Sequence, residues 1–341
     1  APATSGSPET LDAECRKQPE FQLSLIHINA AEMDLVRTHF PQLTGSTHTS
    51  IGYWYWELPE FPAEWMHAFQ GLSELWVASS FCQEAISKVS PIPVVKIPPC
   101  LPPLPDALPD ADAIRERYGI PKGKYAFLCM ADALSALERK NPKGVLEAFT
   151  SAFDRNDDRA CLVVKLSNLS HAKSDIVQEL QLAAQSWPIA VLHTDLDRNE
   201  LTALQSAVDC FVSLHRSEGY GLPLAEAMRL GKPCIATGWS GNMEFMTPWN
   251  ALLVDHELVT IEQTTGEYAA GCTWAEPSIE DAARMMRRLV DDPAHGIAIG
   301  KRAALDIEKA TDPKHVGRVM LERLARVPAT PAPRAAQPQT T

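Results

Sequence analysis

Short apolar segments alternate with helical patterns along most of the chain, and this alternation constrains the fold more than any other feature. Several segments are apolar throughout, as in strands of a parallel sheet with helices on both faces. Such alternation predicts an α/β fold. A helix is expected over 142–153, where apolar residues recur at helical spacing. The expected strands are 23–28, 49–54, 74–79, 93–97, 125–130, 160–166, 189–194, 209–214, 232–238 and 251–254.

One segment interrupts this alternation. Residues 98–109 (PPCLPPLPDALP) contain six prolines in twelve positions. Because proline lacks a backbone donor and fixes φ, the segment can continue neither a helix nor a central strand. We interpret it as a stiff linker between two α/β lobes, which would place a ligand cleft between them. The alternative is a long surface loop within one domain.

The chain ends are expected to be disordered. Residues 1–20 and 327–341 are rich in proline, alanine, threonine and serine and offer little to bury. The first residues have no basic or apolar run typical of a signal peptide, and they are expected to be the start of a fragment. Between the ends, we predict a partial amino-terminal Rossmann-like lobe (21–97), the linker (98–109), a carboxy-terminal lobe (110–294) and terminal helices (295–326).

Composition argues against several classes of protein. The chain has 341 residues, of which 45% are hydrophobic and 22% charged, as in globular proteins. Its 43 acidic residues outnumber 31 basic ones, so the net charge is −12, which argues against nucleic-acid binding. No apolar run approaches the about 18 residues of a membrane-spanning helix. Eight scattered cysteines predict neither a disulfide framework nor a metal site, and they favour the reducing cytoplasm.

The segment 215–230 (HRSEGYGLPLAEAMRL) contains the first group of candidate functional residues. It follows an expected strand, and Gly219 and Gly221 allow the backbone to approach a ligand closely. Pro223 fits the first turn of a helix. A helix N-terminus at the carboxyl end of a parallel strand is suited to bind an anion such as pyrophosphate.

Two carboxylates flank this expected anion site, Glu218 in the loop and Glu226 in the helix. Glu226 lies four residues from both Leu222 and Leu230, so it shares their apolar face. A phosphate would repel this carboxylate, whereas hydroxyl groups of a sugar or ribose would bind it. The alternative is that Glu226 is a salt-bridged helix residue and that the glycines only form a turn.

A second strand–loop–helix unit carries basic candidates. Asn141 followed by Pro142 predicts a helix start, and Arg139 and Lys140 come immediately before it. Cations at a helix N-terminus are unfavourable unless an anion binds there. Lys165, at the end of an apolar strand, is a weaker indication of the same kind. The alternative is a solvated basic patch.

The motifs of the carboxy-terminal half resemble the nucleotide-sugar domain of the retaining glycosyltransferases of family 4, which have the GT-B fold with two Rossmann-like lobes. These motifs are EGYGLPLAE, RKNP and ATGWSGNMEF. Three further motifs resemble the acceptor-side lobe of bacterial polysaccharide-type members: IHINAAE, IGYWYWELPEFP and LWVASSF. The resemblance covers about residues 21–326. The family's lobe opens with a strand and a glycine-rich loop that are missing here, so a truncated amino-terminal lobe is expected.

The resemblance implies a donor site for a nucleoside-diphosphate sugar. Glu218 would bind hydroxyl groups of the transferred sugar, Glu226 the ribose hydroxyls and Lys140 a phosphate. The family has a further arginine about six residues before this lysine; here either Arg139 replaces it or the phosphate is held less firmly. The remaining candidates for donor binding are Lys165, Gly219, Tyr220, Gly221, Leu222, Ser240, Gly241 and Asn242.

The implied reaction transfers a hexose, such as mannose, to a glycan or lipid-linked acceptor in polysaccharide biosynthesis. It would retain the anomeric configuration and need no metal or other cofactor. Lys140 and helix N-termini would stabilise the charge on the leaving nucleotide. The catalytic candidates are Glu218, Lys140 and Glu57. Association with the inner face of the membrane is a further expectation.

The acceptor side leaves more alternatives open. Glu57 lies in the aromatic segment 52–65, which either binds sugar rings or forms part of the core. His27 is interpreted as a core histidine, and His215 stays open as a pocket residue.

Two other functions of the chain are considered. A Rossmann-type oxidoreductase or epimerase is disfavoured because no G-x-G-x-x-G motif opens a helix, and a non-catalytic sugar-nucleotide-binding module stays open.

Overall fold

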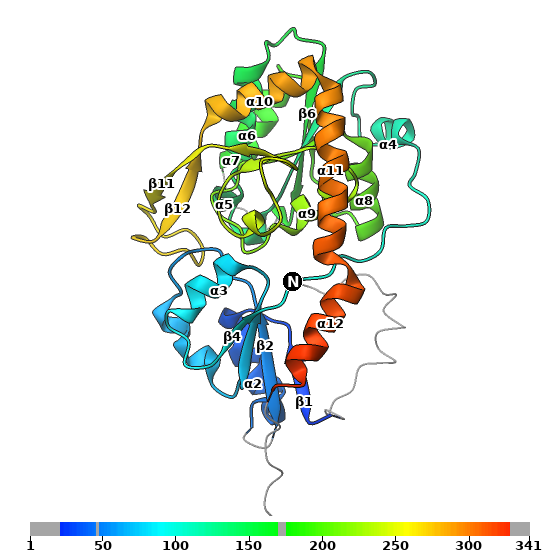
Figure 1. Cartoon of the computed structure of the whole chain (residues 1–341). Helices are drawn as coiled ribbons and strands as arrows, with labels where there is room; N and C mark the ends of the chain where they lie inside the picture. Colours follow the sequence, from blue (N-terminus) through cyan, green and yellow to red (C-terminus); the bar gives the residue numbers. More distant parts are fainter. Residues whose placement is uncertain (1–20, 46–47, 170–174, 328–341) are drawn as a thin grey trace, which may run out of the picture. The chain divides into compact units, whose positions relative to one another are not determined.

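The chain divides into two compact units, which we describe separately (Figure 1). The computed structural model describes residues 21–45, 48–169 and 175–327. Of these, unit 1 contains the residues up to Trp56, then Glu60–Pro99 and the chain from Lys314. Unit 2 contains Glu57–Pro59 and Cys100–Pro313. The ends for which disorder is predicted lie outside the described residues, except for Val327.

Unit 1 is built on a four-stranded parallel sheet in the order β1-β2-β3-β4. Its strands are β1 (Leu23–Ile26), β2 (Thr49–Trp54), β3 (Glu74–Val77) and β4 (Val94–Lys96). Its helices are α2 (Met33–His39), α3 (Ser80–Ser87) and α12 (Pro313–Leu324), with 3₁₀ turns at Ala30–Glu32, Pro41–Thr44 and Ala63–Phe69. Helix α12 is fastened to the sheet because Arg323 Nε donates to Oε1 of the buried Glu74 at 2.8 Å.

Aromatic side chains form much of the core of unit 1. Trp54 and Trp56 are almost fully buried, Trp54 stacks on Phe61, and Trp56 packs edge-on against Trp65 with ring centroids 5.1 Å apart. For these rings, the interpretation of the aromatic segment 52–65 as part of the core is therefore confirmed.

The prediction that His27 is a core residue is wrong. It follows β1, which is an edge strand, and its side chain is exposed. Its ring packs edge-on against Tyr53 at a centroid distance of 4.7 Å.

Unit 2 contains a six-stranded parallel sheet in the order β10-β9-β8-β5-β6-β7. Its strands are β5 (Tyr125–Asp132), β6 (Ala160–Ser167), β7 (Ile189–Leu192), β8 (Cys210–Ser213), β9 (Cys234–Thr237) and β10 (Leu252–Val254). In the registers, Phe127 of β5 lies opposite Leu162 of β6 and Cys210 of β8. With the four strands of unit 1, all ten predicted strands are confirmed.

Helices cover both faces of this sheet, as its apolar strands predict (Figure 1). One layer contains α6 (Pro142–Ala152), α7 (Asp175–Ala184) and α10 (Ile279–Asp291). The other contains α4 (Ala111–Arg117), α8 (Arg198–Ala207), α9 (Leu222–Arg229) and α11 (Pro293–Thr311). The core between the sheet and the first layer includes Phe127, Phe149 and Val164, all completely buried. In the described residues, no helix is both long and apolar enough to cross a membrane.

The strand order reverses between β5 and β8. From β5 the chain continues to β6 and β7 on one side, whereas β8, β9 and β10 lie on the other. In doubly wound sheets, ligands bind beside the carboxyl ends of the strands at such a reversal. The candidate residues Lys140 and Glu218 follow β5 and β8, so the topology brings them to this point.

One element of unit 2 is not predicted from the sequence. It is an antiparallel hairpin of β11 (His256–Thr260) and β12 (Thr273–Pro277), with Val259 opposite Trp274. The hairpin follows β10 and precedes α10. It contributes side chains to the candidate site described below.

Candidate functional site

The candidate site is centred on an ion pair between Lys140 and Glu218. After β5 the chain forms one helical turn, α5 (Leu137–Lys140), which presents two basic side chains. Lys140 Nζ donates to Glu218 Oε1 at 2.5 Å, and Arg139 Nη1 lies 3.5 Å from Glu218 Oε2. Glu218 is only 7% exposed. The fold thus brings together two predicted residues that are 78 positions apart in the chain.

The ion pair controls the protonation state of Glu218. Burial by itself would raise the pKa of this carboxyl, but the charges of Lys140 and Arg139 lower it to about 2. Glu218 is therefore a carboxylate at neutral pH. As a carboxylate it can only accept hydrogen bonds.

The depressed pKa predicts how stability depends on pH. A carboxyl whose pKa falls from 4.5 to about 2 on folding stabilises the protein above pH 4.5, and this stabilisation is lost as the pH falls towards 2. Between pH 6 and 3, Glu218 should account for a loss of about 2 kcal/mol in the free energy of unfolding. Denaturant titrations at both pH values measure the free energy of unfolding. Its loss between pH 6 and 3 should be smaller in Glu218→Gln than in the wild type by this amount. An identical loss in the variant would contradict the ion pair.

The loop after β9 is hydrogen-bonded to the loop that carries Glu218. Ser240 Oγ accepts a hydrogen bond from the Glu218 N–H at 2.9 Å, and the Gly241 N–H donates to the Glu218 carbonyl at 2.8 Å. A Cβ on Gly241 would lie 2.2 Å from the Gly219 carbonyl oxygen, so only glycine allows this approach. Two predicted residues, Ser240 and Gly241, therefore position the backbone around Glu218.

His215 and Asn242 fasten these two loops from inside the protein. His215 is completely buried, and its Nε2 donates to Asn242 Oδ1 at 3.0 Å. Asn242 Nδ2 in turn donates to the Thr237 carbonyl at 3.0 Å. Burial lowers the pKa of His215, so the ring is neutral at pH 7. The side chain of His215 thus holds the two loops together from within the protein.

Helix α9 presents its N-terminus to the same region. It begins at Leu222, directly after Gly221 in the left-handed conformation (φ 92°), and Pro223 lies in its first turn. Gly221 has no side chain to cap the helix, so first-turn N–H groups are available for an anion. The Tyr220 side chain is buried and packs on the ring of Phe245, with the ring centroids 4.9 Å apart.

Helix α6 has its own cap. Asn141 Oδ1 accepts a hydrogen bond from the Gly144 N–H at 3.0 Å, and Pro142 occupies the first position. The predicted helix start is therefore confirmed, and its capped end is a weaker anion site than α9.

Arg139 is held within the protein. Its Nη1 donates to the Ser217 carbonyl at 2.6 Å, and its guanidinium lies over the Tyr268 ring, 5.5 Å from the centroid. The side chain is 3% exposed, and among the described residues its Nε has no hydrogen-bond partner. This geometry suits the positioning of Glu218 better than a direct hold on a ligand.

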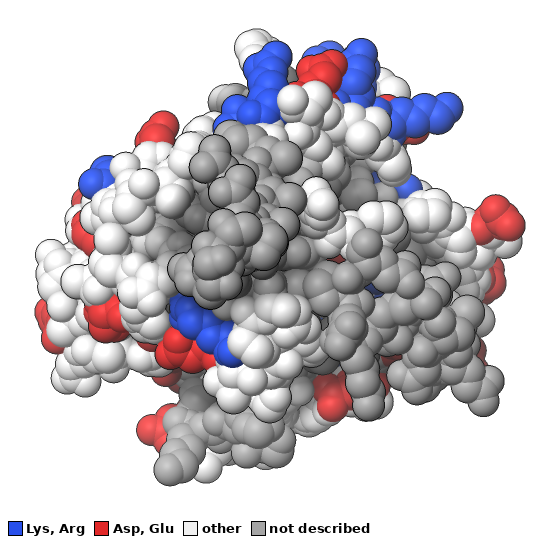
Figure 2. All heavy atoms as spheres, turned by 90° about the horizontal axis from the view of Figure 1, so that it is seen from below, with Lys and Arg blue, Asp and Glu red and all other residues white. Residues whose placement is uncertain are grey.

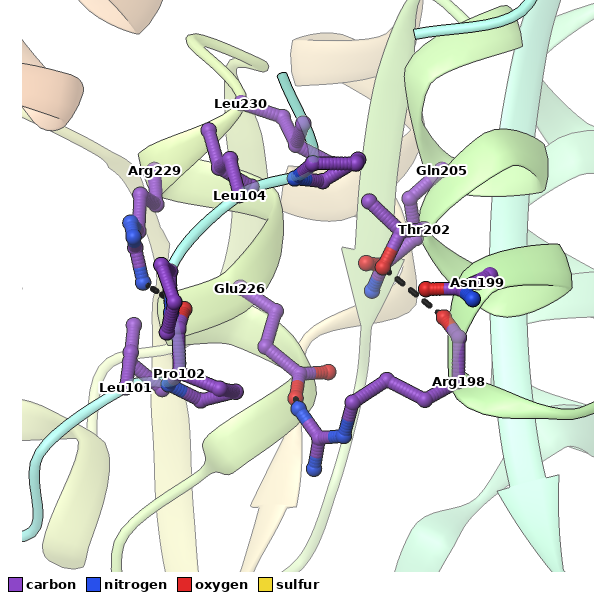
Figure 3. Close-up of a pocket in the computed structure, with 12 residues that line it drawn as sticks. Leu101, Pro102, Leu104, Arg198, Asn199, Thr202, Gln205, Glu226, Arg229 and Leu230 are labelled. Atoms are coloured by element: carbon purple, nitrogen blue, oxygen red, sulfur yellow. Dashed lines mark hydrogen bonds and ion pairs between the residues drawn. The ribbon is translucent and has the colours of Figure 1, made fainter. Parts of the chain in front are cut away.

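Glu226 lines a hollow of about 50 Å³ (Figure 3). Arg198 reaches from α8, and its Nη1 lies 3.2 Å from Glu226 Oε1. The proline-rich segment 101–105 forms one wall of this hollow, and neither Lys140 nor Glu218 is among its described lining residues. Burial raises the pKa of Glu226, and Arg198 opposes this rise. The structure thus shows Glu226 in a salt bridge, and its contact with ribose stays a prediction.

The two remaining candidates lie in different surroundings. Lys165 is buried in β6 and donates to Ser167. Glu57, which groups with unit 2, lies beside the site. Its Oε2 accepts a hydrogen bond from the Tyr268 hydroxyl at 3.1 Å.

Tyr268 is the residue of this site that sequence reasoning missed. It belongs to the loop of the unpredicted hairpin and is almost fully buried. No motif marks it in the sequence, since it is a lone aromatic residue in the polar segment TTGEYAAG.

Figure 2 shows one face of the molecule, on which acidic side chains are interspersed with the basic ones. The residues coloured there form no continuous basic surface. In the described part of the chain, no group of three or more histidine, cysteine or acidic residues could hold a metal ion.

Comparison with known proteins identifies the family. The family model described as "Glycosyl transferases group 1" matches residues 110–306, more than half of the chain. The chain belongs to this family. The resemblance stated from the motifs is confirmed.

Individual relatives of this group 1 glycosyltransferase are distant. A D-inositol 3-phosphate glycosyltransferase from an Arthrobacter species is 29% identical over 192 residues, which are 56% of this chain and 40% of that protein. The aligned region thus spans less than half of that relative.

Solved structures show the same fold. Anabaena HepE in complex with UDP-glucose is 14% identical, with a TM-score of 0.67 over 89% of this chain and 78% of that one. Sucrose-phosphate synthase from Thermosynechococcus elongatus is 17% identical, with a TM-score of 0.64 over 89% and 73%. The predicted GT-B-like α/β fold with parallel sheets is therefore confirmed.

Proposed function

We propose that this group 1 glycosyltransferase transfers a hexose from a nucleoside-diphosphate sugar to a glycan or lipid-linked acceptor. The transfer would retain the anomeric configuration and proceed without a metal. The observation that carries the proposal is the ion pair of Lys140 with the buried Glu218, which lies at the strand-order reversal of unit 2 near the uncapped end of α9. Family membership and the likeness to a structure solved with UDP-glucose support it.

The proposed chemistry follows from these charges. Cleavage of the sugar–phosphate bond leaves negative charge on the diphosphate, which Lys140 and the N–H groups of α9 would stabilise. A lysine ammonium has three donors, so Lys140 can keep its bond to Glu218 and still donate to a phosphate oxygen. Glu218, kept ionised, would accept hydrogen bonds from hydroxyl groups of the sugar.

Glu226 would bind the ribose of the donor. It lies four residues after Leu222, which places it about 6 Å further along the axis of α9. A diphosphate at the N-terminus of α9 and a ribose at Glu226 would therefore follow one helix. Arg198 would have to release the carboxylate, which can then accept hydrogen bonds from two ribose hydroxyls.

Replacement of Glu226 tests this assignment. Glu226→Ala should weaken binding of the nucleoside diphosphate by about 1–3 kcal/mol, because buried ribose hydroxyls would lose their acceptor. Calorimetric titration measures the affinity, and the exposed Glu147, replaced by alanine, is the matched control on α6. Wild-type affinity in Glu226→Ala would show that ribose binds elsewhere.

An activity assay tests the function itself. The full chain is incubated with UDP- and GDP-hexoses, GDP-mannose among them, and release of the nucleoside diphosphate is followed with and without a chelator. We expect release with one of these donors, unchanged by the chelator, and a product with the anomeric configuration of the donor. Tight donor binding without transfer or hydrolysis would favour the non-catalytic module instead.

We also propose the cytoplasm as the place of the reaction, with lipid-linked acceptors reached at the inner face of the membrane. The cysteines of the described residues are all free, and most of them are buried. Reduced cysteines are usual in the cytoplasm.

A further inference from the structure

The β11–β12 hairpin makes a dense set of contacts with the loop that carries Glu218. The centre of these contacts is Arg216, two residues before Glu218. Its Nε and Nη2 donate to the two carboxylate oxygens of Glu276 in β12, at 2.6 and 2.9 Å. Such paired bonds fix the plane of the guanidinium as well as its position.

Two further contacts hold Arg216 against β12. The guanidinium lies over the Trp274 ring, 5.3 Å from the centroid. The Arg216 carbonyl accepts a hydrogen bond from the Ala275 N–H at 2.9 Å. Three consecutive residues of β12 therefore hold both the backbone and the side chain of Arg216.

Arg216 also binds the turn that carries Lys140. Its backbone N–H donates to the Arg139 carbonyl at 2.7 Å, and its Nη1 donates to the Glu138 carbonyl at 2.6 Å. The same residue thus joins the hairpin, the Glu218 loop and α5. The bond between Lys140 and Glu218 spans two segments that Arg216 connects.

The hairpin reaches the site at a second point, Tyr268. Its hydroxyl donates to Glu57 Oε2, and its ring packs against the guanidinium of Arg139, which lies beside Glu218. Burial raises the pKa of Tyr268, so the hydroxyl keeps its proton. The loop of the hairpin therefore contacts the basic turn directly, and β12 contacts it through Arg216.

We propose that the β11–β12 hairpin is a rigid arm that fixes the positions of Lys140 and Glu218 relative to each other. Arg216 is the positioning residue through which the hairpin acts. The effect on turnover rests on the proposed function. The effect on the position of the loop does not, because it follows from the contacts alone.

Glu276→Gln tests the arm without altering the loop. Hydrogen exchange is measured in the full chain, and exchange of the backbone amides of residues 214–220 should become about tenfold faster, since the loop loses one of its fixed partners. Asp291→Asn is the matched control, because it breaks the exposed ion pair with Arg159, which directly precedes β6 and so lies at the amino ends of the strands, away from the Glu218 loop. This control should leave exchange in 214–220 unchanged.

Turnover is measured on the same variants. In Glu276→Gln, kcat should fall about tenfold while the donor KM stays within about twofold, because α9 and Glu226 are untouched. Arg216→Lys keeps the charge but not the paired hydrogen bonds, so its kcat should lie between the kcat values of Glu276→Gln and Arg216→Met. Faster exchange confined to the hairpin, or faster loop exchange with unchanged kcat, would overturn the proposal. If the wild-type chain transfers no sugar, the proposed function fails, while the exchange result still decides whether the arm holds the loop.

Discussion

Glu218→Gln should lower kcat for sugar transfer by at least about a hundredfold. Glutamine has nearly the same shape but no charge, so it would hold both the sugar hydroxyls and Lys140 less well. Steady-state kinetics at saturating donor measure this loss, and circular dichroism checks that the variant is folded. The pH-dependent unfolding described above uses the same variant and reports on the ion pair independently of activity.

The partly exposed Glu179, replaced by glutamine, provides the control for this experiment. It pairs with Lys143 at the surface of unit 2, and exposed pairs of this kind contribute little to stability. The kcat of the Glu179→Gln enzyme should equal that of the wild type. A Glu218→Gln enzyme with near wild-type kcat would remove the carboxylate from the proposed mechanism.

Lys140→Ala should lower kcat by roughly 10²–10³-fold and weaken donor binding much less, because charge on the leaving diphosphate develops mainly in the transition state. Calorimetry measures donor affinity, and the assay measures kcat. Lys140→Arg should restore part of the turnover, since it keeps the positive charge. Removal of Lys140 also leaves Arg139 as the main cation beside Glu218, so the pKa of Glu218 should rise.

Equal turnover in Lys140→Ala and the wild type would exclude Lys140 from catalysis. Equal losses of affinity and turnover would instead indicate that the lysine holds the ground state and the transition state alike. The two results can be told apart because binding and chemistry are measured separately.

The strands could be predicted because their signal is local. Each strand of the two parallel sheets is a short apolar run, and its neighbours along the chain are helices, so sequence order already implies the doubly wound arrangement. The meeting of Lys140 and Glu218 follows from that arrangement, since both residues lie in the segments that follow two strands paired side by side, β5 and β8. The helix start at Asn141 could be predicted for the same reason, because Asn141 and Pro142 form a local sequence signal.

Other features depend on contacts that no local pattern encodes. The hairpin was missed because β11, with the sequence HELVT, is largely exposed and mixes polar and apolar residues. Arg139 looked like a free cation, yet its burial against Tyr268 depends on that hairpin. The salt bridge from Arg198 to Glu226 joins two helices that are separated in sequence by β8. The exposure of His27 follows from its place after an edge strand, which the sequence pattern does not reveal.

Calorimetric titration of the full chain with UDP, GDP and NAD tests the central claim most directly, namely that a nucleoside diphosphate binds unit 2 through Lys140 and Glu226 together. We expect one of the two nucleoside diphosphates to bind at a single site, with lower affinity in both Lys140→Ala and Glu226→Ala. NAD should not compete. Binding of NAD with no binding of UDP or GDP would contradict this claim.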